Sequence, residues 1–584
     1  MKKTKLELTW PGKDKRPQLE PRILLEHPER GHHAASRREG DLFDNMLIKG
    51  DNLLALKALE QDYAGKVKCI YIDPPFNTGA AFEHYDDGLE HSLWLSLMHE
   101  RFAALRTLLS DDGYIFVHLD DNEAAYARVL MDEIFGRANY VATVTTTTNA
   151  PSGFKATSAR IFSTANFILC YRASSSAKPL RRVFALKGYD AAYSKVPQDR
   201  DAPIEDWTWT SLADECAMRQ GYPSSKEAKK KLGDLFDQLV GELAVELARR
   251  VFRTAAIGGG AGIKRRDTIL RSRATRDSVM QHPGEDVENF YILNGEQMIF
   301  YEDRLVEIDG MTVPGEIITD VWTDIGWTGI AREGDVEFKN GKKPEALIKR
   351  ILELATNPGD LILDSFGGSG TTGAVAHKMG RRWIMVEIGD HADTHIVPRL
   401  IKVVDGKDQG GISKAVGWEG GGGFRYFTLA PSLLERDAYD NWVIAPEYNG
   451  PMLAQAMCKH LGFTYDPAQS GDGDERDAEW WRHGRSSERD FLYVTTQALT
   501  QDALRLLSEE VGPDRSLLIC ARAFSGNIDA FENLTCRKIP ASILSKCEWG
   551  RDDYSLNIAA LPEREAADDA PDAGPLFAGE PANG

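Results

Sequence analysis

The chain carries a short motif that could hold an amino group, Asp73-Pro74-Pro75-Phe76, directly after an apolar run of strand length. Proline has a fixed φ and no N–H group, so such a loop presents rigid carbonyl groups beside a carboxylate that can only accept hydrogen bonds. An amino group that donates both hydrogens would fit these acceptors, and the ring of Phe76 could stack on a base turned out of a duplex. A stiff turn that only ends a strand would look the same, so a second motif has to support this reading.

That second motif is rich in glycine and reads DSFGGSGTT, from Asp364 to Thr372, between another apolar run and a helical pattern. Glycine permits positive φ values and lets a ligand approach backbone N–H groups closely. No Gly-Lys-Ser or Gly-Lys-Thr follows, so the turn is not a nucleotide P-loop, and its spacing differs from that of a dinucleotide-binding loop. Glu387 ends the next expected strand, where the hydroxyls of a ribose would lie, although a solvated strand-end acid would look similar.

Apolar runs of strand length alternate with helical periods in two separate parts of the chain. The strands are predicted at 45–50, 67–73, 113–119, 166–172, 360–364 and 382–388, and the helices near 51–62, 91–109, 121–135, 343–355 and 370–380. This alternation indicates an α/β fold with a doubly wound, largely parallel sheet. Since both motifs follow strands of that sheet, we expect them to meet at one of its edges.

The strand and helix pattern lapses between the two blocks and changes again after residue 430. The arm is rich in Pro, Arg, Lys and His without a period, and the tail is rich in Ala, Pro, Asp, Glu and Gly, which does not support a packed core. We therefore predict an N-terminal arm at 1–44, the first half of the α/β domain at 45–175, an inserted domain at 176–320, the second half at 321–430, a C-terminal domain at 431–560 and a disordered tail at 561–584.

The two motifs together resemble those of the β group of DNA amino-methyltransferases, which pair a [DNS]-P-P-[YFW] loop with a later F-x-G-x-G loop. Here these are Asp73 to Phe76, and Phe366, Gly368 and Gly370. The resemblance implies a seven-stranded, Rossmann-like methyltransferase sheet with a circularly permuted motif order. The first half would be catalytic, the second half would bind the cofactor, and the insert would be the target-recognition domain. Phe76 replaces a commoner tyrosine, which keeps the ring face and loses a hydroxyl group.

Longer strings look most like the modification subunit of type III restriction-modification systems. They are FNTG at 76–79, HLDDNE at 118–123, KKPEALIKRIL at 342–352 and DSFGGSGTTG at 364–373. The resemblance covers roughly 45–175 and 315–430. It implies a homodimer that acts on double-stranded DNA and can join a restriction subunit with helicase and nuclease activity. An orphan methyltransferase, or one from another phage-defence system, would have the same motifs.

The resemblance also implies S-adenosylmethionine as cofactor and a role for individual residues. Methyl transfer would go to adenine N6, since Asp rather than Ser precedes Pro-Pro, with cytosine N4 as the alternative; no Pro-Cys motif supports carbon-5 methylation. The catalytic residues would be Asp73, Pro74, Pro75 and Phe76. The cofactor would contact Asp51, Lys343, Pro344, Asp364, Phe366, Gly368, Gly370, Thr371 and Glu387.

The formal net charge of −19 would by itself argue against a nucleic-acid partner, because phosphate contacts need Lys and Arg. The charge is unevenly distributed, however, and one stretch of the expected insert, 264–276, has six basic residues and one acid. We predict that this stretch contacts DNA phosphates, although a solvated charged face would have the same composition. The basic residues are Lys264, Arg265, Arg266, Arg271, Arg273 and Arg276.

Cysteine usage and hydropathy bear on the location of the protein. The seven cysteines include no C-x-x-C pair and no His/Cys cluster has ligand spacing, which favours a reducing cytosol and predicts no metal site. No signal peptide or membrane span is visible, so we expect a cytoplasmic protein.

Two rival functions remain open. A protein or RNA methyltransferase could share the fold, but the permuted motif order and the large insert count against it. A non-catalytic DNA-specificity subunit could keep a degenerate version of the fold, but degeneration should remove the carboxylate or the glycines first. Both motifs retain them.

Overall fold

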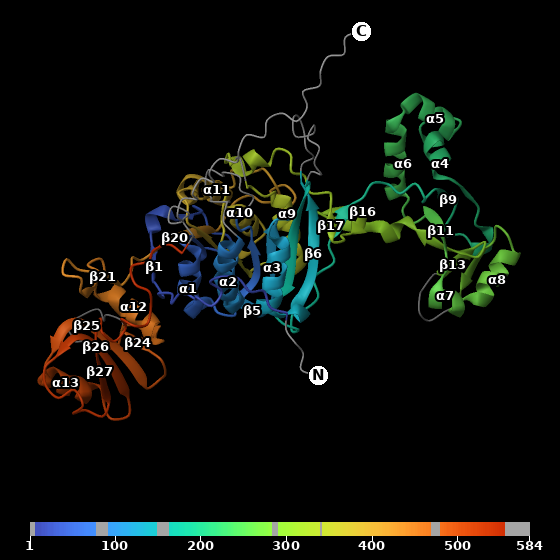
Figure 1. Cartoon of the computed structure of the whole chain (residues 1–584). Helices are drawn as coiled ribbons and strands as arrows, with labels where there is room; N and C mark the ends of the chain where they lie inside the picture. The colour runs from blue at the N-terminus through green and yellow to red at the C-terminus, as the bar shows by residue number, and fades with distance from the viewer. Residues whose placement is uncertain are drawn as a thin grey trace, which may run out of the picture.

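The computed structural model describes residues 6–76, 91–148, 163–282, 290–338, 341–468 and 479–554 of the chain. The expected tail at 561–584 and the residues Asn77 to Gly79 lie outside these ranges. Figure 1 shows a central domain built on one large sheet, with the insert to one side and the C-terminal unit to another. Within the described ranges, no helix is both long enough and apolar enough to span a membrane.

The central domain is built on a mixed sheet. Its strands are β1 (Leu24–Glu26), β2 (His32–His33), β3 (Asn45–Lys49), β4 (Val67–Ile72), β5 (Leu109–Leu119), β6 (Tyr140–Thr147), β7 (Ala165–Arg172), β17 (Val321–Trp322), β18 (Leu361–Asp364), β19 (Arg382–Glu387) and β20 (Gly423–Leu429). They lie in the order β1-β20-β3-β19-β18-β4-β5-β7-β6-β17, with β2 also paired to β20. Neighbours from β20 to β5 are parallel, whereas β7 is antiparallel to both β5 and β6. All six strands predicted from apolar runs are present.

The two sequence blocks interleave in this sheet. β18 and β19 come late in the chain but lie between the early strands β3 and β4. Leu363 of β18 lies opposite Ile70 of β4, and Ile384 of β19 lies opposite Met46 of β3. Seven strands, β3-β19-β18-β4-β5-β7-β6, form the predicted sheet with its permuted order. β1, β2 and β20 extend one edge, and β17 extends the other.

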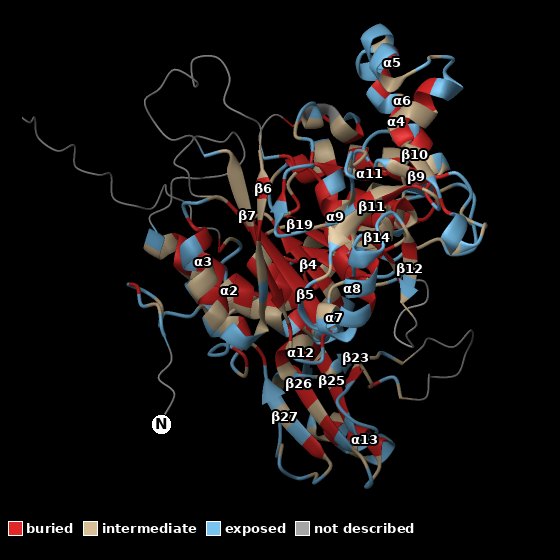
Figure 2. Cartoon of the chain, turned by 90° about the vertical axis from the view of Figure 1, so that its right-hand side faces the viewer, coloured by how far each residue is buried: buried red, intermediate tan, exposed pale blue. Residues whose placement is uncertain are grey.

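Helices cover both faces of the sheet, as expected for a doubly wound fold. One face is covered by α1 (Asn52–Tyr63), α2 (His91–Leu108) and α3 (Ala124–Met131), and the other by α9 (Glu345–Ala355), α10 (Thr371–Lys378) and α11 (Val397–Val404). Phe102 of α2 and Ile351 of α9 belong to the apolar cores on the two faces. The strands between these layers are buried (Figure 2), so they can hold loops rigidly at their ends.

The N-terminal segment packs against the rest of the protein, so the prediction of an unpacked arm at 1–44 is wrong for its described residues. β1 pairs antiparallel with β20, and the side chains of Trp10 and Ile23 are buried. The carboxylate of Glu20 accepts hydrogen bonds from the Leu433 backbone N–H and the Ser432 hydroxyl, each 2.8 Å long. Its Pro- and Arg-rich composition hid this packing, because the contacts depend on a strand partner far along the chain.

The insert is made of short antiparallel strands and helices that stand away from the central sheet (Figure 1). One sheet contains β9 (Lys195–Pro197), β10 (Trp209–Ser211), β11 (Phe252–Ala256), β12 (Val279–His282), β13 (Phe290–Leu293) and β14 (Glu296–Phe300). A second contains β8 (Phe184–Leu186), β15 (Leu305–Ile308) and β16 (Met311–Ile317) and lies toward the central domain. The helices are α4 (Leu212–Arg219), α5 (Ser225–Leu232), α6 (Asp234–Glu246), α7 (Gly259–Lys264) and α8 (Arg266–Ala274).

The C-terminal region has a sheet of its own. A hairpin of β21 (Leu434–Arg436) and β22 (Trp442–Ile444) is followed by α12 (Gly450–Leu461). The sheet then contains β23 (Thr464–Tyr465), β24 (Gly484–Arg485), β25 (Asp490–Leu499), β26 (Ser516–Phe524) and β27 (Leu534–Lys538), with α13 (Gln501–Val511) between β25 and β26. This α/β unit lies within the predicted C-terminal domain at 431–560, of which the structure describes 431–468 and 479–554.

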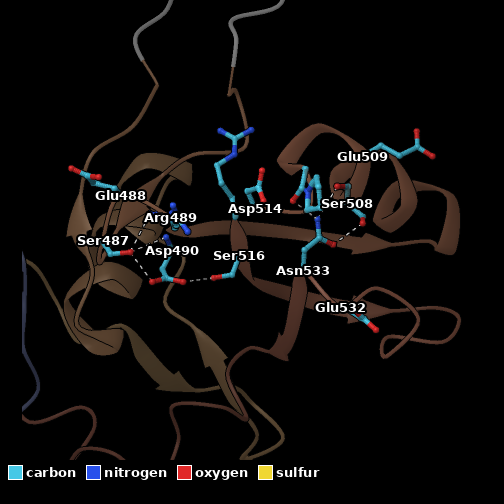
Figure 3. Close-up of a pocket in the computed structure, with 13 residues that line it drawn as sticks. Ser487, Glu488, Arg489, Asp490, Ser508, Glu509, Asp514, Ser516, Glu532 and Asn533 are labelled. Atoms are coloured by element: carbon cyan, nitrogen blue, oxygen red, sulfur yellow. Dashed lines mark hydrogen bonds between the residues drawn. The ribbon is translucent and has the colours of Figure 1, made fainter.

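An open pocket of about 980 Å³ lies in this C-terminal unit (Figure 3). Asp490 at its wall accepts hydrogen bonds from the hydroxyls of Ser487 and Ser516, 2.6 and 2.5 Å long. Both Asp490 and Ser516 begin parallel strands. The pocket is therefore at the amino ends of these strands, opposite the end at which open α/β sheets bind ligands.

Candidate active site

The two predicted loops lie side by side at the carboxyl ends of two central strands of the sheet. Asp73 follows β4 directly and Asp364 ends β18, and these two strands are parallel neighbours. The chain leaves β18 through α10 on one face of the sheet, and β4 is followed by α2 on the other face. Ligands of open α/β sheets bind in the crevice where connections diverge in this way. The prediction that the two motifs meet is confirmed.

Glycine is required at two positions of the loop after β18, for different reasons. Gly368 and Gly370 have φ values of +52° and +76°. A Cβ at Gly370 would lie 3.0 Å from Ile396 Cγ2, so this glycine lets α10 begin close against its neighbour. A Cβ at Gly368 would meet only the Phe366 carbonyl oxygen, at 3.8 Å. Gly368 therefore presents backbone to the crevice without a side chain to cover it.

The carboxylate of Asp364 orders this loop from within. Its Oδ1 accepts a hydrogen bond from the Phe366 backbone N–H at 2.9 Å, and its Oδ2 accepts one from the Thr372 hydroxyl at 2.6 Å. Burial raises the pKa of Asp364 to about 8 against the lowering effect of these two bonds, and the nearby carboxylates of Asp73 and Glu387 raise it further. The acidic side chains of Asp73, Asp364 and Glu387 therefore lie close together at the carboxyl ends of their strands.

Glu387 ends β19 and is bound to the Gly-rich loop. Its Oε2 accepts a hydrogen bond from the Gly368 backbone N–H at 2.8 Å. Its Oε1 accepts one from the Gly389 N–H at 2.8 Å and lies 3.0 Å from His391 Nε2. Glu387, which was expected to contact a ribose, thus lies beside the Gly-rich loop. Its hydrogen bond to Gly368 also fixes the shape of that loop.

Lys343 joins the second sequence block to the loop Asp73–Phe76, the predicted catalytic loop. Its ammonium group forms an ion pair with the carboxylate of Asp73 and lies 4.9 Å from the centre of the Phe76 ring. Pro344 follows at the amino end of α9, which holds the lysine in place. The sequence predicted a cofactor contact for Lys343, and in the structure its charge lies against the carboxylate of Asp73.

Two further contacts hold the catalytic loop. The indole N–H of Trp94, on α2, donates a hydrogen bond of 2.9 Å to the Pro75 carbonyl. The Phe76 ring packs against the His118 ring, with centroids 5.9 Å apart and planes at 33°. The loop is therefore fixed at the carboxyl end of β4. It presents the Asp73 carboxylate, which an amino group would need, and the Phe76 ring, on which a base could stack.

Comparison with known proteins gives the same answer as this geometry. A family model described as DNA methylase matches residues 67–397, which is more than half of the chain. The match spans both loops, the strands that carry them and the insert between them. The chain belongs to the DNA methylase family.

The methylase is similar to Mod subunits of type III enzymes. It is 36% identical over 416 residues to the probable type III restriction-modification enzyme HindVI Mod subunit of Haemophilus influenzae, covering 67% of this chain and 55% of that protein. It is 28% identical over 437 residues to the type III restriction-modification enzyme EcoPI Mod subunit of Escherichia phage P1, covering 65% and 62%. The methylase thus spans between half and two thirds of the length of these relatives. Among solved structures, the M1.HpyAVI–SAM complex matches 61% of the chain at 13% identity with a TM-score of 0.30.

Asp51 of the methylase was predicted to contact the cofactor, and the structure shows it engaged within the chain. Its Oδ1 caps α1 by accepting the Leu54 N–H at 3.0 Å. Its Oδ2 accepts the Tyr554 backbone N–H at 2.9 Å and pairs with Arg101 at 3.4 Å. These contacts give Asp51 a structural role that links the central domain to Tyr554, which follows the sheet of the C-terminal unit; a cofactor contact stays a prediction.

A buried ion network lies beneath the Gly-rich loop of the methylase. Glu345 pairs with Arg399 at 2.7 Å and with Lys378 at 2.9 Å, and Lys378 also pairs with Asp408 at 2.7 Å. Each of these side chains is at most 2% exposed. Arg399 also donates a hydrogen bond of 2.8 Å to the Thr371 hydroxyl, so this predicted cofactor contact serves to anchor α10. Two acids and two bases balance, which is what such a buried cluster needs.

The basic run of the insert lies on α7, α8 and the turn that follows. The exposed members are Lys264, Arg266, Arg271, Arg273 and Arg276. Arg265 differs, because it is buried and its guanidinium lies 4.1 Å from the centre of the Phe290 ring. The structure therefore contradicts the prediction that Arg265 contacts DNA; its charge faces the core of the insert.

Sequence reasoning missed two aromatic residues near the catalytic loop. His118 is the last but one residue of the buried run 113–119 and begins the HLDDNE string, and Trp327 follows the insert. Their rings are in contact, with centroids 6.2 Å apart and planes at 86°. The position of His118 at the end of a buried strand was a usable signal, whereas nothing in the sequence marked Trp327.

Proposed function

We propose that this methylase transfers a methyl group from S-adenosylmethionine to N6 of adenine in double-stranded DNA, as the modification subunit of a type III restriction-modification system. The observation that carries the proposal is the position of the Asp73 loop beside the Gly-rich loop, where the connections of a parallel sheet diverge. The similarity to the HindVI and EcoPI Mod subunits supports the restriction-modification setting.

The Gly-rich loop fits S-adenosylmethionine by its shape and its chemistry. Gly368 leaves backbone uncovered, and Glu387 supplies a buried carboxylate suited to ribose hydroxyls. The ring of Phe366, which is half-buried, suits a positively charged sulfur. When bound, the cofactor supplies an electrophilic methyl group. These residues would hold it, with Asp364 keeping the loop in shape from below.

The catalytic loop fits an exocyclic amino group. The lone pair of adenine N6 is delocalised into the ring, which makes the nitrogen a poor nucleophile. In our proposal, the Asp73 carboxylate and the rigid Pro74 carbonyl accept its two hydrogens, which favours a pyramidal nitrogen with its lone pair directed at the methyl group. Phe76 stacks on the base. The ammonium of Lys343 pairs with the Asp73 carboxylate, so in our proposal Lys343 orients this acceptor.

The insert and the partners follow from the same proposal. The insert would read the target sequence, and its exposed basic residues Lys264, Arg266, Arg271, Arg273 and Arg276 would contact phosphates. The type III setting implies a homodimer, a helicase-nuclease restriction subunit as partner and a cytoplasmic location. The C-terminal unit at 431–554 could present a docking surface for such a partner.

Methylation-aware sequencing tests this proposal directly. DNA from a host without its own methylation is sequenced after expression of the wild-type chain or of the Asp73→Ala variant. We expect modified adenines in one short motif with the wild type and none with the variant. Modified cytosines would support N4 methylation instead. Purified protein with labelled cofactor and DNA, tRNA or protein substrates separates the RNA and protein rivals, and methylation of tRNA or protein alone would refute the proposal.

A further inference from the structure

A buried histidine near the carboxyl end of a central strand is held by both of its ring nitrogens. His118 lies at the end of β5, next to the strand that carries the catalytic loop, and is 0% exposed. Its Nδ1 lies 2.9 Å from the Tyr71 hydroxyl, and its Nε2 lies 3.1 Å from the Asn166 side-chain amide nitrogen. Burial, and then the charge of Lys343, hold the pKa of His118 well below 6.5. The ring is therefore neutral and fixed in orientation.

This fixed ring stands between two aromatic side chains from distant segments. Phe76 packs on it from the catalytic loop, with centroids 5.9 Å apart. Trp327 contacts it edge-on, with centroids 6.2 Å apart, from the segment that joins the insert to the second sequence block. Phe76 belongs to the apolar core on one face of the sheet and Trp327 to the core on the other. The rings of Phe76, His118 and Trp327 thus lie together at the carboxyl ends of the central strands, near Asp73.

The segment that carries Trp327 is firmly anchored. Val321 and Trp322 form β17, paired with β6, and the side chain of Trp322 is 2% exposed. Ile325 is also buried, and the carboxylate of Asp324 accepts a hydrogen bond of 2.8 Å from Arg350 of α9. Trp327 itself is half-buried, unlike Trp322. An anchored tryptophan that is only half-buried, beside a loop suited to an amino group, is placed to contact a planar ligand.

The geometry points to Trp327 as a second aromatic contact for the target base in addition to Phe76, with His118, which both rings contact, as the positioning residue that holds them in place. This inference rests on the proposed function and adds a residue to it. Flipped bases are held by stacking and edge contacts with aromatic side chains.

The test uses the full chain with two duplexes: one with adenine as the target base for methylation kinetics, and one with 2-aminopurine in its place, a probe whose fluorescence changes when the base leaves the stack. For Trp327→Ala we expect kcat/KM for methylation to fall about 10- to 100-fold, the size of a lost base–aromatic contact, and the 2-aminopurine signal to shrink. Trp327→Phe should restore most of both. Cofactor binding should be unchanged. Trp480→Ala, at a 39% exposed tryptophan in the C-terminal unit, is the matched control and should change neither.

The role of His118 is tested with His118→Gln, which can keep hydrogen bonds to Tyr71 and Asn166, and His118→Leu, which cannot. As a positioning residue, His118 should affect kcat more than KM, and glutamine should retain more activity than leucine. Wild-type kinetics and fluorescence in a folded Trp327→Ala protein would overturn the inference while leaving the proposed function intact. A wild-type chain that methylates no DNA would overturn both.

Discussion

The Gly-rich loop after β18 and the catalytic loop after β4 are held in different ways. The Gly-rich loop is fixed from within by the buried carboxylates of Asp364 and Glu387, and the Glu345 network lies beneath it. The catalytic loop is held by side chains that belong to the site itself, among them Lys343 on Asp73. The side chains of the Glu345 network are at most 2% exposed, whereas those of the Lys343–Asp73 pair are 8% and 17% exposed, so water and a ligand can reach that pair more easily.

This difference assigns separate tasks to the two sides. A rigid loop can hold the cofactor in advance, without reorganisation at the moment of reaction. A loop fastened by an exchangeable partner can accept a base that arrives from a duplex. Changes on the Gly-rich side should therefore lower stability, and changes on the catalytic side should lower activity.

The largest effect is expected beneath the Gly-rich loop. Glu345→Gln leaves Lys378 and Arg399 buried with too little negative charge, so we expect a loss of about 3–5 kcal/mol of unfolding free energy. Denaturant unfolding followed by tryptophan fluorescence measures it. Glu353→Gln on the same helix is the control, since Glu353 forms a partly exposed pair with Lys349 and should contribute less than about 1 kcal/mol. Equal losses would refute the comparison.

The catalytic side should respond in the opposite way. Asp73→Asn keeps the size of the side chain but replaces an acceptor oxygen with a donor, so we expect kcat to fall about 10²- to 10³-fold, the effect of removing one preorganised hydrogen-bond partner. Its loss of stability should be smaller than that of Glu345→Gln. Single-turnover methylation and thermal unfolding measure the two quantities. A variant that keeps full activity would show that the negative charge and the second oxygen of Asp73 are not needed.

His118 predicts a pH dependence of stability on the catalytic side. Its pKa in the folded protein is held well below the ordinary 6.5 by burial, so the fold favours the neutral ring. The unfolded chain binds the extra proton as the pH falls below 6.5, and the stability from this group is therefore full above that pH and decreases below it. The slope is about 1.4 kcal/mol per pH unit. Unfolding of wild type and His118→Gln at pH 7 and pH 5.5 should diverge accordingly, and parallel curves would contradict the prediction.

The smallest effects separate two adjacent arginines of the insert. Arg265→Ala removes a buried guanidinium from Phe290 and should destabilise the insert by about 1–2 kcal/mol without changing the salt dependence of DNA binding. Arg266→Ala should leave stability unchanged and reduce the slope of log affinity against log salt by about one. Thermal unfolding and DNA titrations at several salt concentrations measure both. Exchanged phenotypes would show that the exposed face is not the DNA face.

The sequence predicted the central fold because buried parallel strands appear as continuous apolar runs. The runs that became β4 and β18 are of this kind, and each leads into a loop with distinctive residues, so both motifs could be located. β6 was missed, because its threonine-rich strand has no such run. The insert stayed unreadable for a related reason, since its strands are short and antiparallel.

The site was predicted in part because only some of its contacts follow from local sequence. Asp73 and Gly368 belong to motifs, whereas the pairing of Lys343 with Asp73 depends on the sheet order that brings two blocks together. The bonds of His118 to Tyr71 and Asn166 depend on the register between three strands. Arg265 differs from its neighbours only through the turn of its helix toward Phe290, which a charge pattern does not reveal.

The interleaving of late strands between early ones has a consequence for synthesis of the protein. β3 and β4 leave the ribosome long before β18 and β19, yet they become neighbours only through those two strands. Until then each has an unpaired side that could join another nascent chain, and the long separation makes closure of the sheet slow. A chain interrupted anywhere before β18 would lack the middle of its own sheet, so translation must be nearly complete through the second block before a functional site can form.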